Sequence, residues 1–377
     1  MQPFTIAVPE AVLDDLRRRL ANTRWPDDGA GWEYGPALAY MKDLADYWLH
    51  RYDWRKHEAY LNRFAQFGAE IDGTGIHFIH ERGRGPDPTP VLLLHGWPDS
   101  FYRYHRAVPI LTGPGTSCHV VVPSLPGHGF SDRKAMTTDD TADLFARLMT
   151  DVLGYEKFVA AGGDAGALIV QTLADRHPDV LLGIHLTDVG YPDRTTDYST
   201  LTGPELEFAD SIREWWTNEG AFNIVQSTKP QSLAYGLADS PAGLAAWIMS
   251  FMASGTTGEE VEKRIGRDDL LTNIMIYWVT QTAASSVRRY YLDAHAPLGP
   301  WRRTSVPAAV AHPPRDAPLP REWAERRVNL KRFTELPCGG HFAAWEEPEL
   351  YAADLWGFLR ELRNPGRPSG PAPRGSP

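Results

Sequence analysis

The sequence predicts an α/β fold in which helices cover both faces of a mostly parallel sheet. From Thr89 onward, short apolar runs alternate with mostly helical stretches: "TPVLLLHGW", "CHVVVPSLPGHG", "KFVAAGGD", "LLGIHLTDV" and "AAVAHPP". Continuous apolar strands between helices are typical of a parallel sheet buried on both sides. The stretch from about Tyr191 to Leu298 breaks this alternation with helical patterns such as "PAGLAAWIMSFMAS". A helical insertion late in the sheet is typical of a lid over an active site.

Residues 1–88 are expected to form a mainly helical N-terminal extension. Apolar residues recur at helical spacing in "PEAVLDDLRRRLAN" and "ALAYMKDLADYWLHRYDW", and the first of these begins with proline. "IDGTGIHFIHER" predicts a hairpin with Gly73 to Gly75 as its turn. The core is then expected over 89–190 and 300–363, and the lid over 191–299. The tail, 364–377, is rich in Pro, Gly and Ser and is expected to be disordered.

Composition excludes several classes of function. The formal net charge of −10 over 377 residues argues against a nucleic-acid partner, which needs a basic patch. The two cysteines, Cys118 and Cys338, lack metal-ligand spacing. We expect neither a metal site nor a cofactor. The N-terminus lacks the apolar core of a signal peptide, and no window approaches the roughly 18 apolar residues of a membrane span. We expect a soluble cytoplasmic protein without a membrane partner, and the sequence leaves a homodimer open.

One carboxylate stands at a turn between an apolar run and a helical pattern. In "FVAAGGDAGALIV" the spacing is Gly-x-Asp-x-Gly, with Gly162, Asp164 and Gly166. A strand, a sharp turn and a helix with small neighbours form the elbow that holds a nucleophile above a sheet. Asp is already ionised at neutral pH and can attack an alkyl carbon to give an ester. The alternative interpretation is a helix N-cap, a common place for Asp.

Two backbone N–H groups are candidates for an oxyanion hole. "LLLHGWPDS" ends an earlier strand, and the loop after that strand can donate one N–H, while the residue after the nucleophile donates the other. These residues are Trp97 and Ala165. They would stabilise the negative oxygen that forms when water attacks the ester.

A histidine and a second aspartate complete the predicted catalytic set. His341 lies on a glycine-rich turn in "CGGHFAAWEEPEL", and Asp316 follows the strand "AAVAH". The order nucleophile, acid, histidine is the order of the α/β-hydrolases. Asp316 would orient the imidazole, and His341 would take a proton from water. A packed or surface histidine and a loop aspartate are the alternatives.

Over residues 4–362 the chain resembles the microsomal-type epoxide hydrolases, including their N-terminal extension. The resemblance is carried by long motifs: "HGWPDS", "PSLPGHGFSD", "STKPQSLAYGLADSPAGLAAWI", "DDLLTNIMIYW" and "GGHFAAWEEPEL". It implies an α/β-hydrolase core with a helical lid, an N-terminal segment (1–88) that wraps around both, and the conversion of an epoxide to a vicinal diol. It also implies Asp164 as nucleophile, His341 as base and Asp316 as its acid.

In that family two lid tyrosines bind the epoxide oxygen. The resemblance puts one at Tyr290, four residues after the serine pair, with Tyr291 as the alternative one position on. The other position, eight residues before Pro230, holds Phe222, which has no O–H. Trp215, Trp216 or Gln226 could donate instead. We expect Phe222, Trp97, Tyr291 and Trp215 to contact the substrate.

A second departure from the family is Ala165, where relatives usually carry Trp. The backbone N–H is kept, but the volume of the side chain is lost, so we expect a wider pocket. We expect the substrate to be a bulky or natural-product epoxide, and the enzyme to act in detoxification or secondary metabolism. The alternatives are a haloalkane dehalogenase-like hydrolase, an enzyme that opens or cyclises an epoxide without hydrolysis, and a non-catalytic relative.

Overall fold

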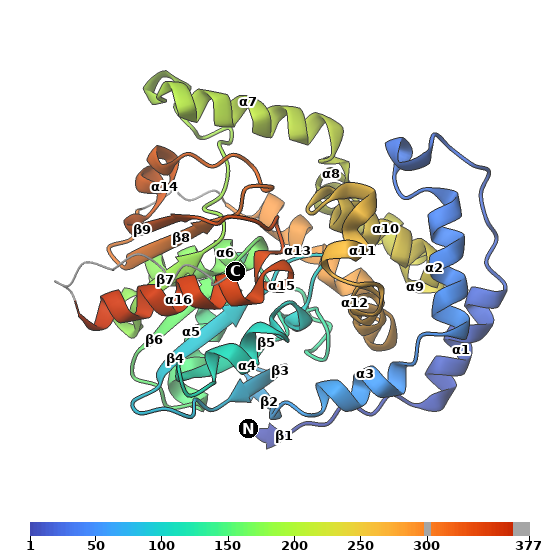
Figure 1. Cartoon of the computed structure of the whole chain (residues 1–377), viewed down its shortest axis with the longest axis horizontal. Coiled ribbons are helices and arrows are strands. Elements are labelled where there is room, and N and C mark those ends of the chain that lie inside the picture. The colour runs from blue at the N-terminus through green and yellow to red at the C-terminus, as the bar shows by residue number, and fades with distance from the viewer. Residues whose placement is uncertain (298–302, 365–377) are drawn as a thin grey trace, which may run out of the picture.

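A computed structural model describes residues 1–297 and 303–364 (Figure 1). In these ranges nine strands form one sheet, in the order β1-β2-β3-β5-β4-β6-β7-β8-β9. The six strands from β4 to β9 run parallel to one another, whereas β1, β2 and β3 pair antiparallel, β3 with β5 at the junction. The predicted α/β class is therefore confirmed. The strands are β1 Gln2–Pro3, β2 Gln66–Ile71, β3 Thr74–Glu81, β4 Thr89–Leu94, β5 Cys118–Pro123, β6 Phe158–Gly162, β7 Leu181–Leu186, β8 Pro307–His312 and β9 Asn329–Glu335.

The predicted hairpin is present, but its turn lies earlier than expected. Asp72 and Gly73 connect β2 to β3 with φ values of 51° and 67°, and Gly75 is already part of β3. A two-residue turn with both residues in the left-handed region matches the twist of the flanking strands. Asp-Gly suits that conformation, so the turn forms there rather than at Gly73 to Gly75.

Strand β9 was not among the predicted strands. Its sequence, "NLKRFTE", has no continuous apolar run, and its residues are half-buried or exposed. It pairs with β8 alone and forms the edge of the sheet. An edge strand needs less apolar surface than a central one, so the pattern that predicted the other strands does not detect it.

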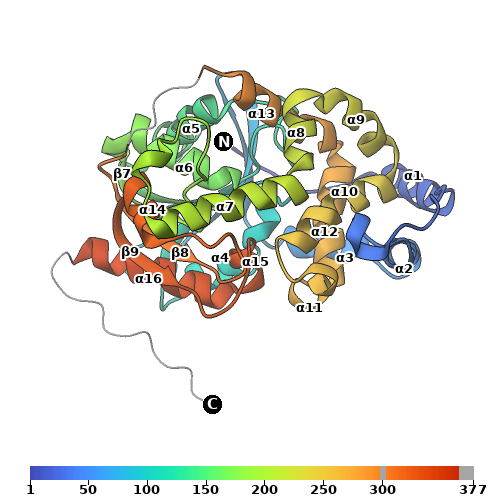
Figure 2. The same cartoon turned by 90° about the horizontal axis from the view of Figure 1, so that it is seen from above.

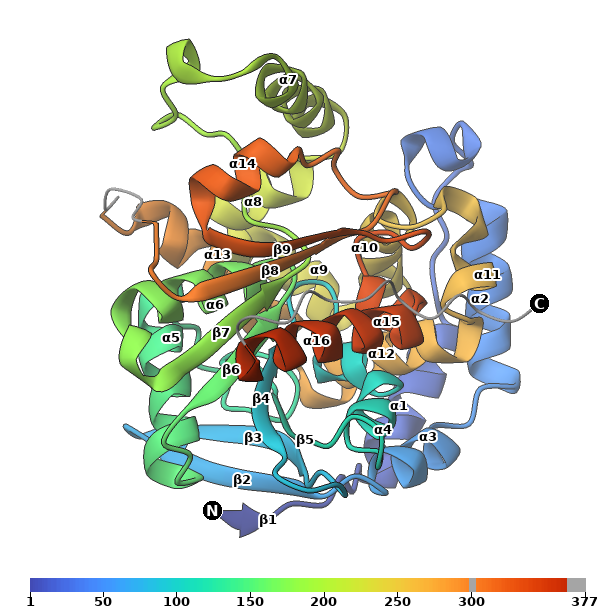
Figure 3. The same cartoon turned by 60° about the vertical axis from the view of Figure 1, so that its left-hand side comes forward.

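Successive side chains of the central strands enter two hydrophobic clusters, one on each face of the sheet. In β4, Val91 and Leu93 join one cluster, whereas Leu92 and Leu94 join the other. Figure 3 shows helices on both faces of the sheet. Apart from the insertion between β7 and β8, the α-helices that follow β4 are α4 Ala107–Leu111, α5 Thr138–Arg147, α6 Ala165–Arg176, α14 Arg321–Arg327, α15 Ala343–Glu346 and α16 Pro348–Arg363.

Between β7 and β8 the chain forms helices and no strand in the described residues. They are α7 Gly203–Asn218, α8 Ala221–Thr228, α9 Pro230–Asp239, α10 Pro241–Ser254, α11 Val261–Arg264, α12 Arg267–Thr280 and α13 Ala283–His295. Seen from above, α7 crosses the molecule between α14 and the other helices of this insertion (Figure 2).

Three N-terminal helices lie beside this insertion: α1 Glu10–Ala21, α2 Leu38–His50 and α3 Trp54–Leu61 (Figure 1). Tyr47 donates a hydrogen bond to Asp268 on α12, 2.7 Å between Oη and Oδ1, and the hydroxyls of Tyr52 and Thr272 lie 2.9 Å apart. The N-terminal segment thus contacts both the sheet, through β1 to β3, and α12. The domain boundaries themselves stay a prediction.

Of the predicted disordered tail, only Asn364 is among the described residues. No helix within the described ranges combines the length and the apolar character that a bilayer crossing requires.

Candidate active site

Asp164 lies at the sharp turn between β6 and α6, as the glycine pattern predicts. Its φ of 54° is in the left-handed region, which residues other than glycine rarely adopt. The neighbouring glycines are required by close contacts: a Cβ on Gly166 would lie 2.1 Å from the carbonyl oxygen of Leu94, and one on Gly162 would lie 2.5 Å from the carbonyl carbon of Gly166. Although Asp164 precedes the helix, its side chain forms no N-cap hydrogen bond. Because the backbone of Asp164 is strained and its carboxylate does not cap α6, a functional role is favoured over the N-cap interpretation.

The carboxylate of Asp164 faces two backbone donors. The N–H of Trp97 donates to Oδ1 at 2.9 Å, and the N–H of Ala165 lies close enough to the carboxylate to lower its pKa. The two predicted oxyanion donors therefore both lie at Asp164. Burial alone would raise the pKa of Asp164, but His341 and these two N–H groups lower it to about 2. Asp164 is therefore an anion at neutral pH.

His341 lies between the two predicted carboxylates. Its Nε2 is 3.4 Å from Oδ2 of Asp164, and its Nδ1 is 3.2 Å from Oδ2 of Asp316. Burial alone would lower the pKa of His341, but Asp316 and Asp164 together raise it well above the ordinary value. Each ring nitrogen of His341 therefore faces one carboxylate, the arrangement in which a carboxylate can orient an imidazole.

A third carboxylate, which the sequence analysis did not single out, lies beneath the turn. Oδ2 of Asp188, just after β7, accepts the N–H of Asp164 at 2.8 Å. Burial, together with the nearby carboxylates of Asp316 and Asp164, raises the pKa of Asp188 to about 7. A polar residue directly after an apolar strand, at the same sheet edge as the nucleophile, is the signal that could have identified it.

A cavity of about 960 Å³ opens above Asp164. Its walls include Trp97, Ala165, Trp215, Phe222 and Tyr290, together with His341 and Asp316. All these predicted site residues therefore meet at one cavity. Its volume is near the upper end of the range for small-molecule sites, about 300–1,000 Å³.

The structure distinguishes between the two neighbouring tyrosines of α13. Tyr290 lines the cavity, where burial and the charge of Asp164 raise the pKa of its phenol well above the ordinary value. Tyr291 is not among the residues that line the cavity; its side chain is 40% exposed and stacks on His295. The expectation that Tyr291 contacts the substrate therefore does not fit the register of α13, which turns the next residue away from the cavity.

Phe222, on α8, faces the site without offering a donor. Among the predicted substitutes, Trp215 and Trp216 line the cavity. Gln226 does not: its Oε1 accepts a hydrogen bond from Trp247 at 3.0 Å, outside the cavity wall. One further cavity residue with a hydroxyl is Tyr191, after β7, which the sequence analysis did not consider.

Among the described residues, no group of three His, Cys, Asp or Glu side chains could hold a metal ion.

Family models and relatives agree on one family. Residues 1–104 match the model described as "Epoxide hydrolase N terminus", and residues 89–348 match "alpha/beta hydrolase fold". A Stigmatella aurantiaca protein assigned as an epoxide hydrolase is 40% identical over 96% of this chain and 85% of its own. Epoxide hydrolase 1 of Oryctolagus cuniculus is 32% identical over 95% of this chain and 88% of its own.

Two solved structures are similar over nearly the whole chain. The juvenile hormone epoxide hydrolase of Bombyx mori superposes with a TM-score of 0.87 and 27% identity, covering 97% of this chain and 95% of the other. The epoxide hydrolase of Aspergillus niger gives a TM-score of 0.83 and 28% identity, covering 96% of each chain.

Proposed function

Since this chain belongs to the epoxide hydrolases of the α/β-hydrolase fold, we propose that it forms an alkyl ester on Asp164 and hydrolyses that ester with water activated by His341. The family, the fold and the enzyme class expected from the sequence are confirmed. The observation that carries the mechanism is the surroundings of one carboxylate. Asp164 has Trp97 N–H at 2.9 Å on one oxygen and His341 Nε2 at 3.4 Å from the other.

In the first step an oxygen of Asp164 attacks a ring carbon of the epoxide. The C–O bond of the ring breaks, and the ring oxygen takes the phenolic proton of Tyr290. The products of this step are an ester on Asp164, a new hydroxyl on the substrate and a phenolate at Tyr290. A donor aimed at the developing negative oxygen lowers the barrier to this opening.

In the second step His341 takes a proton from water, and the resulting hydroxide attacks the carbonyl carbon of the ester. The N–H groups of Trp97 and Ala165 stabilise the tetrahedral oxyanion. Collapse of this intermediate releases the second substrate oxygen, which takes the proton from His341. Asp164 is left as a carboxylic acid and loses its proton to solvent, and Tyr290 regains a proton from solvent. The sum is one epoxide and one water converted to one vicinal diol, with Asp164 restored.

Ester formation itself prepares the base. In the free enzyme two anions, Asp316 and Asp164, raise the pKa of His341. Alkylation turns Asp164 into a neutral ester, so one of these anions disappears and the pKa of His341 falls. The imidazole then loses its proton more readily and can accept one from water.

The substrate is proposed to be a bulky epoxide. The cavity of about 960 Å³ and the small side chain of Ala165 at its floor support this. Similar proteins of Bombyx mori and Manduca sexta are named juvenile hormone epoxide hydrolase. The cytoplasmic location stays a prediction, and whether the protein forms a homodimer stays open.

A single turnover in H₂¹⁸O tests the mechanism. Water attacks the carbonyl of the ester, so we expect label in the Asp164 carboxylate, detected by mass spectrometry of the peptide that contains it. Label found only in the diol would mean direct attack by water and would falsify the ester mechanism. A screen of styrene-type and bulky epoxides, with halide release from haloalkanes measured in parallel, separates epoxide hydrolysis from dehalogenation.

A further inference from the structure

Arg103, beneath the active site, connects three segments that each carry a catalytic group. Its side chain is 1% exposed, and that of its ion-pair partner Asp99 is fully buried. The two charges lie 2.7 Å apart, between Nη1 and Oδ2. Burial raises the pKa of Asp99, while Asp99 holds the pKa of Arg103 above its ordinary value despite burial. A buried ion pair contributes little net stability, so its contacts are a better guide to its role.

The pair fixes the loop that carries the Trp97 donor. The second oxygen of Asp99, Oδ1, accepts the N–H of Gly96 at 2.7 Å. The N–H of Trp97, the next residue, then points at Asp164. On the other side, α12 holds the same loop: Asn273 Nδ2 donates to the carbonyl of Pro98 at 2.7 Å, and Tyr277 donates to the carbonyl of Asp99 at 2.6 Å.

Arg103 also fixes the loop that carries the base. Its Nη2 donates to the backbone carbonyl of His341 at 2.9 Å. The N–H groups around that carbonyl are held as well: Oε1 of the buried Glu346 accepts the N–H of Gly340 at 3.0 Å and that of Phe342 at 3.1 Å. Arg103 supplies the one side-chain donor to this turn among the described hydrogen bonds.

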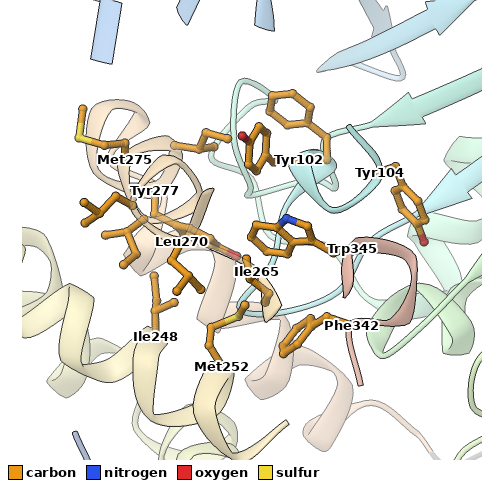
Figure 4. Packing of buried hydrophobic residues seen from close by; sticks show 14 of the residues in the cluster. Tyr102, Tyr104, Ile248, Met252, Ile265, Leu270, Met275, Tyr277, Phe342 and Trp345 are labelled. Atoms are coloured by element: carbon orange, nitrogen blue, oxygen red, sulfur yellow. The ribbon is translucent and has the colours of Figure 1, made fainter. Parts of the chain in front are cut away.

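The same guanidinium lies against the nucleophile turn. A Cβ on Gly163 would come within 2.6 Å of Arg103 Nη2, so the residue before Asp164 rests on the guanidinium. Figure 4 shows Tyr102 and Phe342, the sequence neighbours of Arg103 and His341, near Trp345; the ring centroids of Tyr102 and Trp345 are 5.6 Å apart. One rigid cation therefore touches the oxyanion loop, the nucleophile turn and the base loop.

We propose that Arg103, with Asp99, is a positioning unit that keeps the Trp97 N–H, the Asp164 carboxylate and the His341 imidazole in register for ester hydrolysis. The inference rests on the proposed two-step function. Hydrolysis needs all three groups at once, because water must lie between His341 and an ester carbonyl that the N–H groups hold. Ring opening needs Asp164 and Tyr290 but no proton transfer through His341. Loosening the unit should therefore slow the second step more than the first.

The test is a stopped-flow comparison of the two steps in Arg103→Gln and Arg103→Lys. We expect Arg103→Gln to slow ester hydrolysis by about 10- to 100-fold, since a displacement of 1 Å can cost that much, while ring opening changes by less than about threefold. The ester should accumulate during turnover and be detectable by mass spectrometry. Arg103→Lys keeps the charge and one or two of the hydrogen bonds, so it should restore part of the lost rate.

The matched control is Arg332→Gln. Arg332 binds the buried Asp354 at 2.7 Å, between β9 and α16, and does not line the cavity. It should lower the melting temperature without changing the ratio of the two rates. If Arg103→Gln does not fold, the double variant Asp99→Asn/Arg103→Gln, which leaves no unpaired charge, is measured in its place.

These measurements distinguish failure of the positioning role of Arg103 from failure of the ester mechanism. An unchanged ratio of the two rates in a folded Arg103 variant, or an equal change in Arg332→Gln, overturns the positioning role alone. If no ester forms in the wild type or in any variant, the covalent mechanism fails, whatever Arg103 does.

Discussion

The ring of Phe222 stacks on the indole of Trp97, with centroids 5.6 Å apart and planes inclined by 13°. Tyr290 stands edge-on to both, at 6.1 Å from Trp97 and 6.2 Å from Phe222. Trp97, whose N–H binds Asp164, thus also packs its indole against both Phe222 and Tyr290. Of the three rings in this group, Tyr290 alone carries a hydroxyl, and Phe222 covers the indole with an apolar face.

Phe222→Tyr should increase the rate of ring opening. The new hydroxyl would lie near Tyr290, and a second donor to a developing oxyanion is worth about 10- to 100-fold where the geometry allows. The measurement is the rate of ester formation with one epoxide in both proteins. Phe222→Leu is the control for a change of packing. A rate that stays the same or falls in Phe222→Tyr would show that the epoxide oxygen lies elsewhere.

Tyr290→Phe should nearly abolish ring opening. Removal of a single oxyanion donor costs roughly 10²- to 10³-fold, and Phe222, at the second expected tyrosine position, has no hydroxyl that could compensate. Tyr291→Phe changes the adjacent, 40%-exposed residue by the same atom and should have little effect. If the two variants behave alike, Tyr290 is not the acid. In that case Tyr191→Phe is the next variant to measure, because Tyr191 also lines the cavity.

His341→Gln should leave the enzyme trapped as the ester. Asp164 can still attack, but no base activates the water, so the first turnover proceeds and the second step stops. The expected observation is a protein mass increased by that of the substrate, on the peptide containing Asp164. Hydrolysis at the wild-type rate in this variant would remove His341 from the mechanism.

Asp188→Asn should raise stability at alkaline pH. Since folding raises the pKa of Asp188 to about 7, the folded state holds this proton more tightly than the unfolded state. The stability that this group contributes is therefore full at low pH and is lost as the pH rises through about 7. Asn stays neutral and its oxygen can still accept the N–H of Asp164. The gain over wild type should grow by on the order of 1–3 kcal/mol between about pH 5.5 and about pH 8.5. Denaturant unfolding at both pH values measures it, and a constant difference contradicts the prediction.

Ala165→Trp should narrow the range of substrates. The backbone N–H stays, so the oxyanion contact survives, while the indole fills the floor of the cavity. For a bulky epoxide kcat/KM should fall by about 10-fold or more, whereas for a small one it should change by less than about threefold, since steric exclusion acts on the larger molecule. Ala165→Ser, which adds one atom, is the control. Equal losses for both substrates would indicate damage to the turn itself.

The parts of the site that a local pattern encodes were predictable from the sequence. The turn at Asp164 depends on glycines within two residues of it, and the predicted set of Asp164, His341 and Asp316 does meet at one cavity. The choice between Tyr290 and Tyr291 was not predictable by counting, because one residue rotates a helical side chain by about 100°. The rotation of α13 in the fold settles which of them reaches the cavity.

Contacts between distant segments were beyond the sequence pattern. Arg103 and His341 are 238 residues apart, and nothing near either residue indicates that a guanidinium binds the carbonyl of the base. In the sequence Asp188 only follows an apolar run, and its contact with the N–H of Asp164 depends on the fold. Strand β9 was not predicted for another reason, because an edge strand can be half-exposed and still pair with its neighbour.

The contacts of α12 limit which segments of this enzyme can be exchanged independently. Tyr47 and Tyr52 of the N-terminal segment bind α12, and Asn273 and Tyr277 of α12 bind the loop that carries the Trp97 donor. A chimera that takes its lid from a relative, to change substrate preference, would replace those anchors as well. Such a transplant must keep this chain's own α12, or take residues 1–61 and the Trp97 loop from the same relative as the lid. Otherwise a gain in pocket shape would come with a loosened oxyanion donor.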